Sequence, residues 1–103
     1  MSYSFRLSYK AESNLQKISN NDKGIARRIL KKIDQILKKP LHYDFLKGDL
    51  HGARKGKVGY YRIIYDIYEQ DQLIVILDIG HRKDIYSNSN VSKIVEIRKL
   101  GLY

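Results

Sequence analysis

The spacing of apolar residues predicts two amphipathic helices in the first forty residues. Behind Ser8, which can cap a helix, apolar residues recur at helical intervals: Ala11, Leu15 and Ile18. A second helix is expected over about residues 23–38, with one apolar face formed by Ile25, Ile29, Leu30, Ile33, Ile36 and Leu37. Pro40 ends this helix. Because the connection between the two helices is short, we expect an antiparallel helix hairpin.

Alternating and continuous apolar runs predict β-strands in the rest of the chain. Residues 3–7 alternate polar and apolar side chains, and residues 54–58 look like a second short strand. Residues 60–68 alternate over a longer stretch and predict a strand with two distinct faces. Residues 73–79 are apolar on both faces, which is typical of a central strand that is covered on both sides.

The C-terminal part predicts one more strand and a last helix. Residues 85–86 are expected to add a short edge strand. A helix over about residues 91–100 has Asn88 or Ser89 as its possible cap and ends at Gly101. The order of elements predicts an α+β fold in one small domain, residues 1–103. Its mostly antiparallel sheet of about four strands would carry the helix hairpin on one face, with a C-terminal helix.

The charge balance narrows the classes of partner. Lys and Arg number 20 against 11 Asp and Glu, which gives a net charge of +9 on a chain of 103 residues. Such an excess favours polyanions: nucleic acid, an anionic membrane or an acidic protein. The hydrophobic fraction of 43% is ordinary for a globular domain, so the charge does not indicate a disordered tail.

The sequence lacks the usual signals of a metal site, of secretion and of a membrane span. The chain has no cysteine, and its three histidines do not have metal-ligand spacing, so we expect neither a metal nor a cofactor. No signal peptide is visible and the longest apolar run is too short to span a bilayer. We therefore expect a soluble cytoplasmic protein that does not bind membranes.

Two arginines are the first candidates for binding a phosphate. Arg62 lies in the middle of a predicted strand, on the face that the helix hairpin need not cover, and its planar donors suit a phosphate. The alternative is a salt bridge with Asp66 on the same face. Arg82 follows the apolar strand at a turn, where strand ends often present functional side chains. Its alternative is a solvated loop arginine.

Cations and aromatic rings surround these arginines in the sequence. Lys55 and Lys57 share one face of a short strand and Arg54 lies on the other; such lysines could also simply protect a sheet edge. A lysine crowded by other cations is more easily deprotonated, which suits a general base. Aromatic and imidazole side chains that could stack on a base or move a proton are Tyr60, His81 and Tyr86. A half-buried tyrosine at a sheet edge is the structural alternative.

Taken together, these residues resemble the RelE/ParE toxin superfamily of toxin–antitoxin modules. The matching pieces, in order, are Leu46-x-Gly48, Gly59-x-Tyr61-Arg62-x-x-Tyr65 and Gly80-His81-Arg82-x-x-Ile85-Tyr86. In that superfamily, RelE-like members cut mRNA in the ribosomal A site, whereas ParE-like members poison DNA gyrase. Basic residues before the Tyr-Arg strand and a tyrosine after the Gly-x-Arg turn are similar to the RelE-like branch.

The resemblance implies a type II toxin that is a ribosome-dependent, metal-independent endoribonuclease. The expected catalytic residues are Lys55, Lys57, Arg62, Arg82 and Tyr86, and the expected substrate-binding residues are Arg54, Tyr60 and His81. The expected partners are a cognate RelB-like antitoxin, the ribosome and mRNA. Two alternatives remain: a gyrase poison without nuclease activity, and a basic module that binds nucleic acid without cleaving it.

Overall fold

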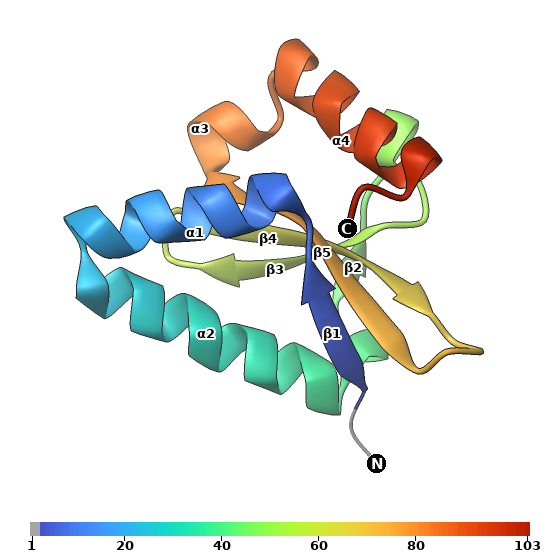
Figure 1. Cartoon of the computed structure of the whole chain (residues 1–103), viewed down its shortest axis with the longest axis horizontal. Helices are drawn as coiled ribbons and strands as arrows, with labels where there is room; N and C mark the ends of the chain where they lie inside the picture. Colours follow the sequence, from blue (N-terminus) through green and yellow to red (C-terminus); the bar gives the residue numbers. More distant parts are fainter. Residues whose placement is uncertain (1–2) are drawn as a thin grey trace.

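A single sheet with helices on both faces forms the protein in the computed structural model, which describes residues 3–103 (Figure 1). The strands are β1 (Ser4–Leu7), β2 (Asp44–Phe45), β3 (Arg54–Val58), β4 (Tyr61–Tyr68) and β5 (Leu73–His81). The helices are α1 (Tyr9–Asn21), α2 (Lys23–Lys38), α3 (Arg82–Ile85) and α4 (Asn88–Leu100), with short 3-10 turns η1 (Pro40–His42) and η2 (Gly48–Leu50). The predicted α+β fold and its helix hairpin are confirmed.

The sheet is mostly antiparallel, as predicted, and has five strands in the order β1-β5-β4-β3-β2. β3, β4 and β5 form an antiparallel meander in its centre. β1 is the exception, because it pairs in parallel with β5, from Ser4 opposite Leu73 to Leu7 opposite Ile76. The fifth strand, β2, contributes only two residues beside β3 and was not predicted from the sequence.

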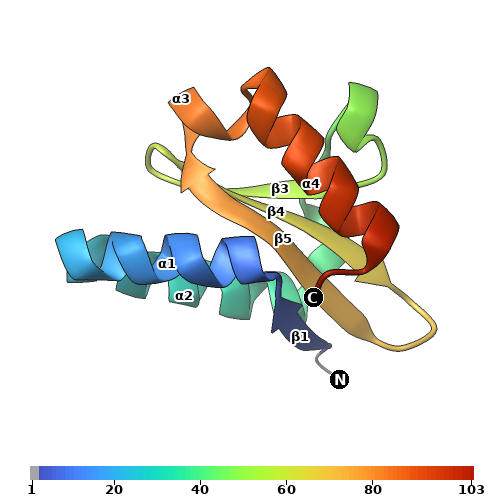
Figure 2. The same cartoon turned by 45° about the horizontal axis from the view of Figure 1, so that its top comes forward.

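Two separate hydrophobic cores lie on the two sides of the sheet. The hairpin of α1 and α2 covers one face, and α4 crosses the other (Figure 2). The core under the hairpin is built from Ala11, Ile29, Ile33, Ile36, Val58, Ile63, Tyr65, Ile74, Ile76 and Ile79. The core under α4 is built from Leu46, Leu50, Ala53, Ile64, Val75, Leu77, Ile85, Ile94 and Ile97. Thus β5 is buried on both faces, which confirms the reading of its apolar run.

The prediction that Leu30 belongs to the buried face of the hairpin is wrong. Leu30 is 52% exposed, although Ile29 beside it is fully buried. Consecutive residues on a helix point about 100° apart, so Leu30 is turned away from the face that Ile29 presents to the sheet. The rest of the predicted face packs against the hairpin-side core.

The predicted edge strand at residues 85–86 is also wrong. Residues 82–85 form the single helical turn α3, and Tyr86 is its C-terminal cap. The His81 ring caps this turn by accepting a hydrogen bond from the backbone N–H of Lys83 at 3.1 Å. Ile85 is buried against β5, where a Cβ on Gly80 would lie 3.7 Å from it.

The last helix begins earlier than predicted. Its cap is Ser87, whose hydroxyl accepts a hydrogen bond from the N–H of Asn90, so α4 starts at Asn88 rather than near residue 91. It ends at Gly101 as expected, because that residue has a φ of +64°, a conformation that favours glycine. Among residues 3–103, no helix is both long and apolar enough to cross a membrane.

Candidate functional site

By strand alternation three cationic residues belong to one face of the sheet at the β3–β4 end, and two of them, Lys55 and Lys57, also line hollows beside α2. In the strand register Lys57 lies opposite Arg62, and Arg62 lies opposite Gly80. Their neighbours along the strands face the hairpin core, so Lys57 and Arg62 belong to the other face, as predicted for Arg62. Lys55 shares that face because it is two residues from Lys57 on the same strand. Gly80 contributes no side chain to this row, which leaves room for α3 above it.

Arg62 and Arg82 both contact the two-residue turn between β3 and β4. One guanidinium nitrogen of Arg62, Nη1, donates to the carbonyl oxygens of Gly59 and Tyr61, each at 2.9 Å. The Arg82 guanidinium lies 4.8 Å from the centre of the Tyr60 ring, and its backbone N–H donates to the Tyr60 carbonyl at 2.7 Å. The turn therefore brings together two arginines that are twenty positions apart in the sequence.

The alternative reading of Arg62 as a salt-bridge partner of Asp66 is wrong. Asp66 is bound by Arg98 from α4, with Nε to Oδ2 at 2.9 Å and Nη2 to Oδ1 at 3.1 Å. Among the hydrogen bonds of residues 3–103, Nε and Nη2 of Arg62 have no protein acceptor. Guanidinium donors without a protein acceptor are the kind of group that can bind an anion.

Tyr86 lies beside Arg62 at the end of α3. Burial raises the pKa of the Tyr86 hydroxyl, and the nearby positive charge of Arg62 lowers it by less, so the net pKa is above its ordinary value. The hydroxyl therefore keeps its proton at neutral pH. The residue is 39% exposed, which leaves part of its ring open to a ligand.

Tyr60 and His81 form an aromatic group at the same turn, where their rings stack on each other. Tyr60 is 62% exposed and stacks on the His81 ring at 5.8 Å between centroids. His81 lies opposite Tyr61 in the register, so its ring is on the hairpin side. The structure thus separates His81 from the face that carries Arg62.

A β-bulge explains why His81 lies on that side. Ile64 pairs with Asp78 and Tyr65 pairs with Ile76, so Leu77 is an extra residue in β5. The bulge reverses the alternation of side chains after residue 77. Without it, His81 would face the same side as Arg62.

Arg54 is held away from the other cations by its own contacts. Its Nη1 donates to the carbonyl oxygens of Leu41 at 3.2 Å and Tyr43 at 2.6 Å. Its guanidinium also lies 3.8 Å from the centre of the exposed Phe45 ring. Since Arg54 is opposite Tyr65 in the register, it lies on the hairpin side. Arg54 thus lies on the opposite face of β3 from Lys55 and Lys57, as the alternation predicted, and its Nη1 fastens residues 41–45 to the sheet.

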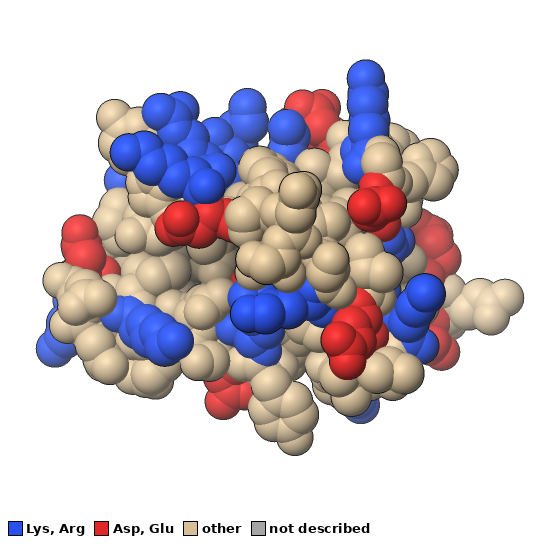
Figure 3. Space-filling model, turned by 90° about the horizontal axis from the view of Figure 1, so that it is seen from above, with Lys and Arg blue, Asp and Glu red and all other residues tan. Residues whose placement is uncertain are grey.

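The cations of this face are not neutralised by the protein. The ion pairs found in the described part of the chain are Lys10–Asp78, Lys38–Asp34 and Arg98–Asp66. None of them involves a lysine or arginine of the candidate site. Lys and Arg side chains gather densely on one corner of the molecule, on the side where α3 lies (Figure 3). Among residues 3–103 no group of side chains could hold a metal ion.

The comparison with known proteins places these observations in a family. The family model described as "ParE toxin of type II toxin-antitoxin system, parDE" matches residues 5–86. The chain belongs to the RelE/ParE toxin superfamily. The resemblance found in the sequence motifs is thereby confirmed. The matched range contains every candidate site residue and ends at Tyr86, before α4 begins.

Relatives of this RelE/ParE toxin come from archaea and bacteria. It is 25% identical over 92 residues to "Putative toxin RelE4" of Methanocaldococcus jannaschii, which covers 88% of this chain and 98% of the relative. A chain of the RelBE2 toxin–antitoxin complex of Mycobacterium tuberculosis has a TM-score of 0.70 and 25% identity, over 80% of this chain and 100% of that one. A free mutant of Escherichia coli RelE shares the fold, with a TM-score of 0.73 and 18% identity over 93% and 97% of the two chains.

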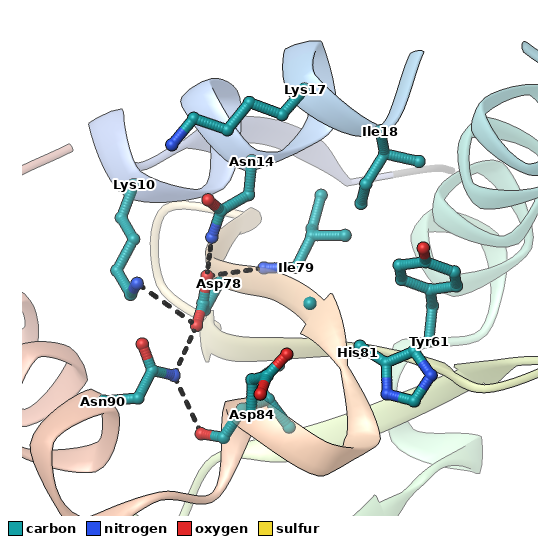
Figure 4. A pocket seen from close by; sticks show the side chains of 12 residues that line it. Lys10, Asn14, Lys17, Ile18, Tyr61, Asp78, Ile79, His81, Asp84 and Asn90 are labelled. Atoms are coloured by element: carbon teal, nitrogen blue, oxygen red, sulfur yellow. Dashed lines mark hydrogen bonds and ion pairs between the residues drawn. The ribbon is translucent and has the colours of Figure 1, made fainter. Parts of the chain in front are cut away.

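One buried polar group of this RelE/ParE toxin was missed in the sequence. Asp78 is 1% exposed and lies within β5, among residues otherwise read as a continuous apolar run. A carboxylate inside such a run is itself a signal, because a buried charge needs several partners. Its partners come from α1 and α4, and they line a cavity of about 330 Å³ between these helices and the end of β5 (Figure 4).

Proposed function

We propose that this toxin is a ribosome-dependent, metal-independent endoribonuclease that cleaves mRNA in the ribosomal A site. The observation that carries the proposal is the unneutralised group of Lys55, Lys57 and Arg62 on one sheet face, with the protonated Tyr86 hydroxyl beside Arg62. A fixed cluster of cations with an aromatic ring suits a phosphodiester and its base. It does not suit a protein interior, where like charges would be costly.

The proposed reaction uses the RNA's own 2′-hydroxyl as the nucleophile. The 2′-oxygen loses its proton and forms a bond to the adjacent phosphorus, while the bond from phosphorus to the 5′-oxygen breaks. The products are a 2′,3′-cyclic phosphate and a 5′-hydroxyl, which takes up one proton. No water or metal enters this step, and DNA cannot react because it lacks the 2′-hydroxyl.

Each site residue has a chemical role in this proposal. Lys55 or Lys57 accepts the proton of the 2′-hydroxyl as the general base. Arg62 and Arg82 stabilise the extra negative charge on the phosphate in the transition state, a contribution of about 3 kcal/mol for a well-placed donor. Tyr86 orients the nucleotide, and its hydroxyl can give a proton to the 5′-oxygen because it stays protonated at neutral pH.

The test is a translation extract with purified toxin and one defined mRNA, with cleavage mapped by primer extension with and without ribosomes. The wild type is expected to produce cuts in phase with codons only when ribosomes are present. Arg62→Ala with Arg82→Ala should abolish them, whereas Arg6→Ala should not. Arg6 is an exposed cation in β1, at the opposite edge of the sheet, so it controls for the loss of charge. Undiminished cutting by the double variant would refute the proposed site.

A second candidate function is poisoning of DNA gyrase without nuclease activity. The observation in its favour is that the matching family model is described as a ParE toxin. It predicts gyrase-dependent breaks in DNA while mRNA in the same cells stays intact. Intact mRNA together with such breaks would replace the endoribonuclease proposal.

An acidic antitoxin of the RelB type is the proposed partner. RelB–RelE complexes are among the similar structures, including one from Pyrococcus horikoshii with a TM-score of 0.63 and 25% identity. Acidic segments laid over the cationic face would offset part of the +9 net charge. We expect the complex to weaken steeply between low and high salt. An affinity that does not change with salt would contradict an electrostatic contribution to this contact.

A further inference from the structure

A buried carboxylate joins three elements behind the candidate site. Asp78 of β5 accepts hydrogen bonds from Asn14 Nδ2 of α1 at 2.9 Å and from Asn90 Nδ2 of α4 at 2.8 Å. Its Oδ1 also accepts from the backbone N–H of Ile79 at 2.9 Å, and Lys10 Nζ lies 3.8 Å from Oδ2 (Figure 4). Both carboxylate oxygens are therefore occupied, one mainly by α1 and the other mainly by α4.

Asn90 makes a second contact that connects this carboxylate to the segment bearing Tyr86. The same amide nitrogen, Nδ2, donates to the backbone carbonyl of Ile85 at 2.8 Å. That carbonyl belongs to the planar peptide group that joins Ile85 to Tyr86. The hydrogen bond from Asn90 therefore fixes the orientation of the peptide group that precedes the Tyr86 Cα. Figure 4 shows Asn90 between Asp78 and this carbonyl.

Apart from the burial of Ile85 against β5 and the Arg82 N–H bond to the Tyr60 carbonyl, the hydrogen bonds of this segment are local. α3 is a single helical turn, and a helix of this length is not stable by itself. Beyond it, the N–H of Ser87 donates to the Asp84 carbonyl at 3.1 Å, and the Ser87 hydroxyl accepts from the N–H of Asn90 at 3.3 Å. These bonds lie within the segment itself. Asn90 adds a hydrogen-bonded tie to the central strand, through Asp78, to the apolar contact that Ile85 makes with β5.

We propose that Asn90, anchored by Asp78, is a positioning residue that holds Tyr86 against Arg62. The inference rests on the proposed function for its effect on cleavage, but its structural part does not. In the described chain the Asn90 side chain donates hydrogen bonds to Asp78 and to the Ile85 carbonyl and makes none with Arg62 or Tyr86, so its proposed effect passes through the Ile85–Tyr86 peptide group. The cavity bordered by Asn90 leaves space into which a released segment could shift.

Asn14 provides a matched control for Asn90. Each of the two asparagines donates one hydrogen bond from Nδ2 to Asp78, at 2.9 and 2.8 Å. Only Asn90 also donates to the Ile85 carbonyl, next to Tyr86, because Asn14 lies on α1 at the other side of the carboxylate. A purely structural role of the Asp78 network predicts equal effects of the two alanine variants. A positioning role predicts a difference.

The experiment compares Asn90→Ala with Asn14→Ala in two measurements. The first is native-state hydrogen exchange of the backbone amides of residues 86–91, which does not depend on any activity. We expect exchange there to rise at least about tenfold in Asn90→Ala and to stay within about twofold of wild type in Asn14→Ala. Thermal unfolding of both variants checks that they remain folded. Equal exchange in the two variants would overturn the proposal.

The second measurement is a kinetic double-mutant cycle with Tyr86→Phe in the translation extract. Asn90→Ala alone is expected to lower the maximal cleavage rate about tenfold with little change in the half-saturating ribosome concentration. In the Tyr86→Phe background it should cause little further loss, because the hydroxyl that it positions is already gone. Fully additive losses would show that Asn90 does not act through Tyr86. A wild type that never cleaves mRNA would refute the proposed function, while the exchange result would still decide the positioning role.

Discussion

Ser8 is a residue whose single hydroxyl group serves two elements. It is fully buried, accepts a hydrogen bond from the N–H of Ala11 at 3.0 Å and donates one to the carbonyl of Leu77 at 2.7 Å. The first bond caps α1. The second satisfies the carbonyl of the extra residue in the β5 bulge, which the sheet ladder leaves without its regular partner. One side chain thus links the start of the hairpin to the irregularity that turns His81 to the hairpin side.

Replacing Ser8 with alanine should therefore cost more than the loss of a helix cap. We expect Ser8→Ala to lower the free energy of unfolding by about 2–4 kcal/mol, since a cap contributes about 1 kcal/mol and a buried unpaired carbonyl costs about 1–3 kcal/mol. Ser87→Ala is the control, because Ser87 is exposed and only caps α4. It should cost about 1 kcal/mol. Denaturant unfolding measures both, and equal losses would contradict the double role of Ser8.

Tyr65 predicts how stability changes in alkaline solution. It is fully buried, and its hydroxyl donates to the Pro40 carbonyl at 2.7 Å. Burial is the main cause that raises the pKa of Tyr65 above its ordinary value of 10.0, and the positive charge of Arg54 opposes it. Above pH 10 the unfolded chain loses this proton while the folded chain keeps it, so stability is complete below pH 10 and falls as pH rises.

The measurement is the free energy of unfolding between about pH 9 and pH 11, compared with that of Tyr65→Phe. The variant should be less stable at neutral pH by about 1 kcal/mol, because the Pro40 carbonyl loses its partner. Its free energy of unfolding should also fall less steeply above pH 10 than that of the wild type. Parallel curves for the two proteins would mean that Tyr65 does not hold its proton in the folded state. Tyr86, whose pKa is also raised by burial, accounts for part of the remaining slope.

At the scale of elements, α4 is held to the sheet by one strong ion pair as well as by its apolar face. Arg98 binds Asp66 of β4 through two nitrogens and donates to the His51 carbonyl at 3.1 Å. Asp66 is only 8% exposed. A carboxylate buried in this way becomes costly once its partner is removed. The pair therefore ties α4 to both β4 and the 3-10 turn region.

Arg98→Ala is expected to lower the free energy of unfolding by about 3 kcal/mol, because it leaves the Asp66 charge buried without its partner. Lys38→Ala is the control, because it removes one partner of an exposed i,i+4 ion pair in which Lys38 Nζ lies 3.1 Å from Asp34 Oδ2. It should lower the free energy of unfolding by less than about 0.5 kcal/mol. Thermal or denaturant unfolding distinguishes the two. Similar costs for both variants would show that burial of Asp66 does not matter.

The elements that the sequence predicted are those whose signals are local. Helix caps and apolar spacing identified α1, α2 and the C-terminal helix, and continuous apolarity identified β5. The single turn α3 has too few residues for a periodic pattern, and it depends on the bare surface of Gly80 in another element. β2 exists because two residues happen to pair with β3. Such contacts cannot be read from a segment alone.

The sequence predicted the sheet face of some candidate site residues and could not predict that of others. Strict alternation placed Lys55 and Lys57 on one face of β3 and Arg62 on the face of β4 away from the hairpin, and the regular register of the two strands agrees. It could not place His81, since the bulge at Leu77 reverses the alternation of β5. The Arg98–Asp66 pair was equally hidden, because its members are 32 residues apart.

At the scale of the whole molecule, the excess of positive charge predicts salt-dependent binding of single-stranded RNA. We expect the logarithm of the affinity to fall linearly with the logarithm of salt concentration, by about 0.7 per neutralised phosphate. Arg62→Ala should reduce this slope by about 0.7, whereas Arg6→Ala at the other sheet edge should leave it unchanged. Fluorescence anisotropy with a short RNA at several salt concentrations measures the slopes. An equal reduction for both variants would mean that binding is spread over the whole surface.

The parallel pairing of β1 with β5 has a consequence for how the toxin is made. Ser4 must find Leu73, so the sheet can close only after most of the chain has left the ribosome. The helix hairpin can form early from local contacts, but its apolar face has no sheet to cover until β4 and β5 exist. Contacts so distant in sequence slow folding. A newly synthesised chain therefore passes through a period in which the apolar face of its helix pair is exposed, and the candidate site can assemble only near the end of synthesis.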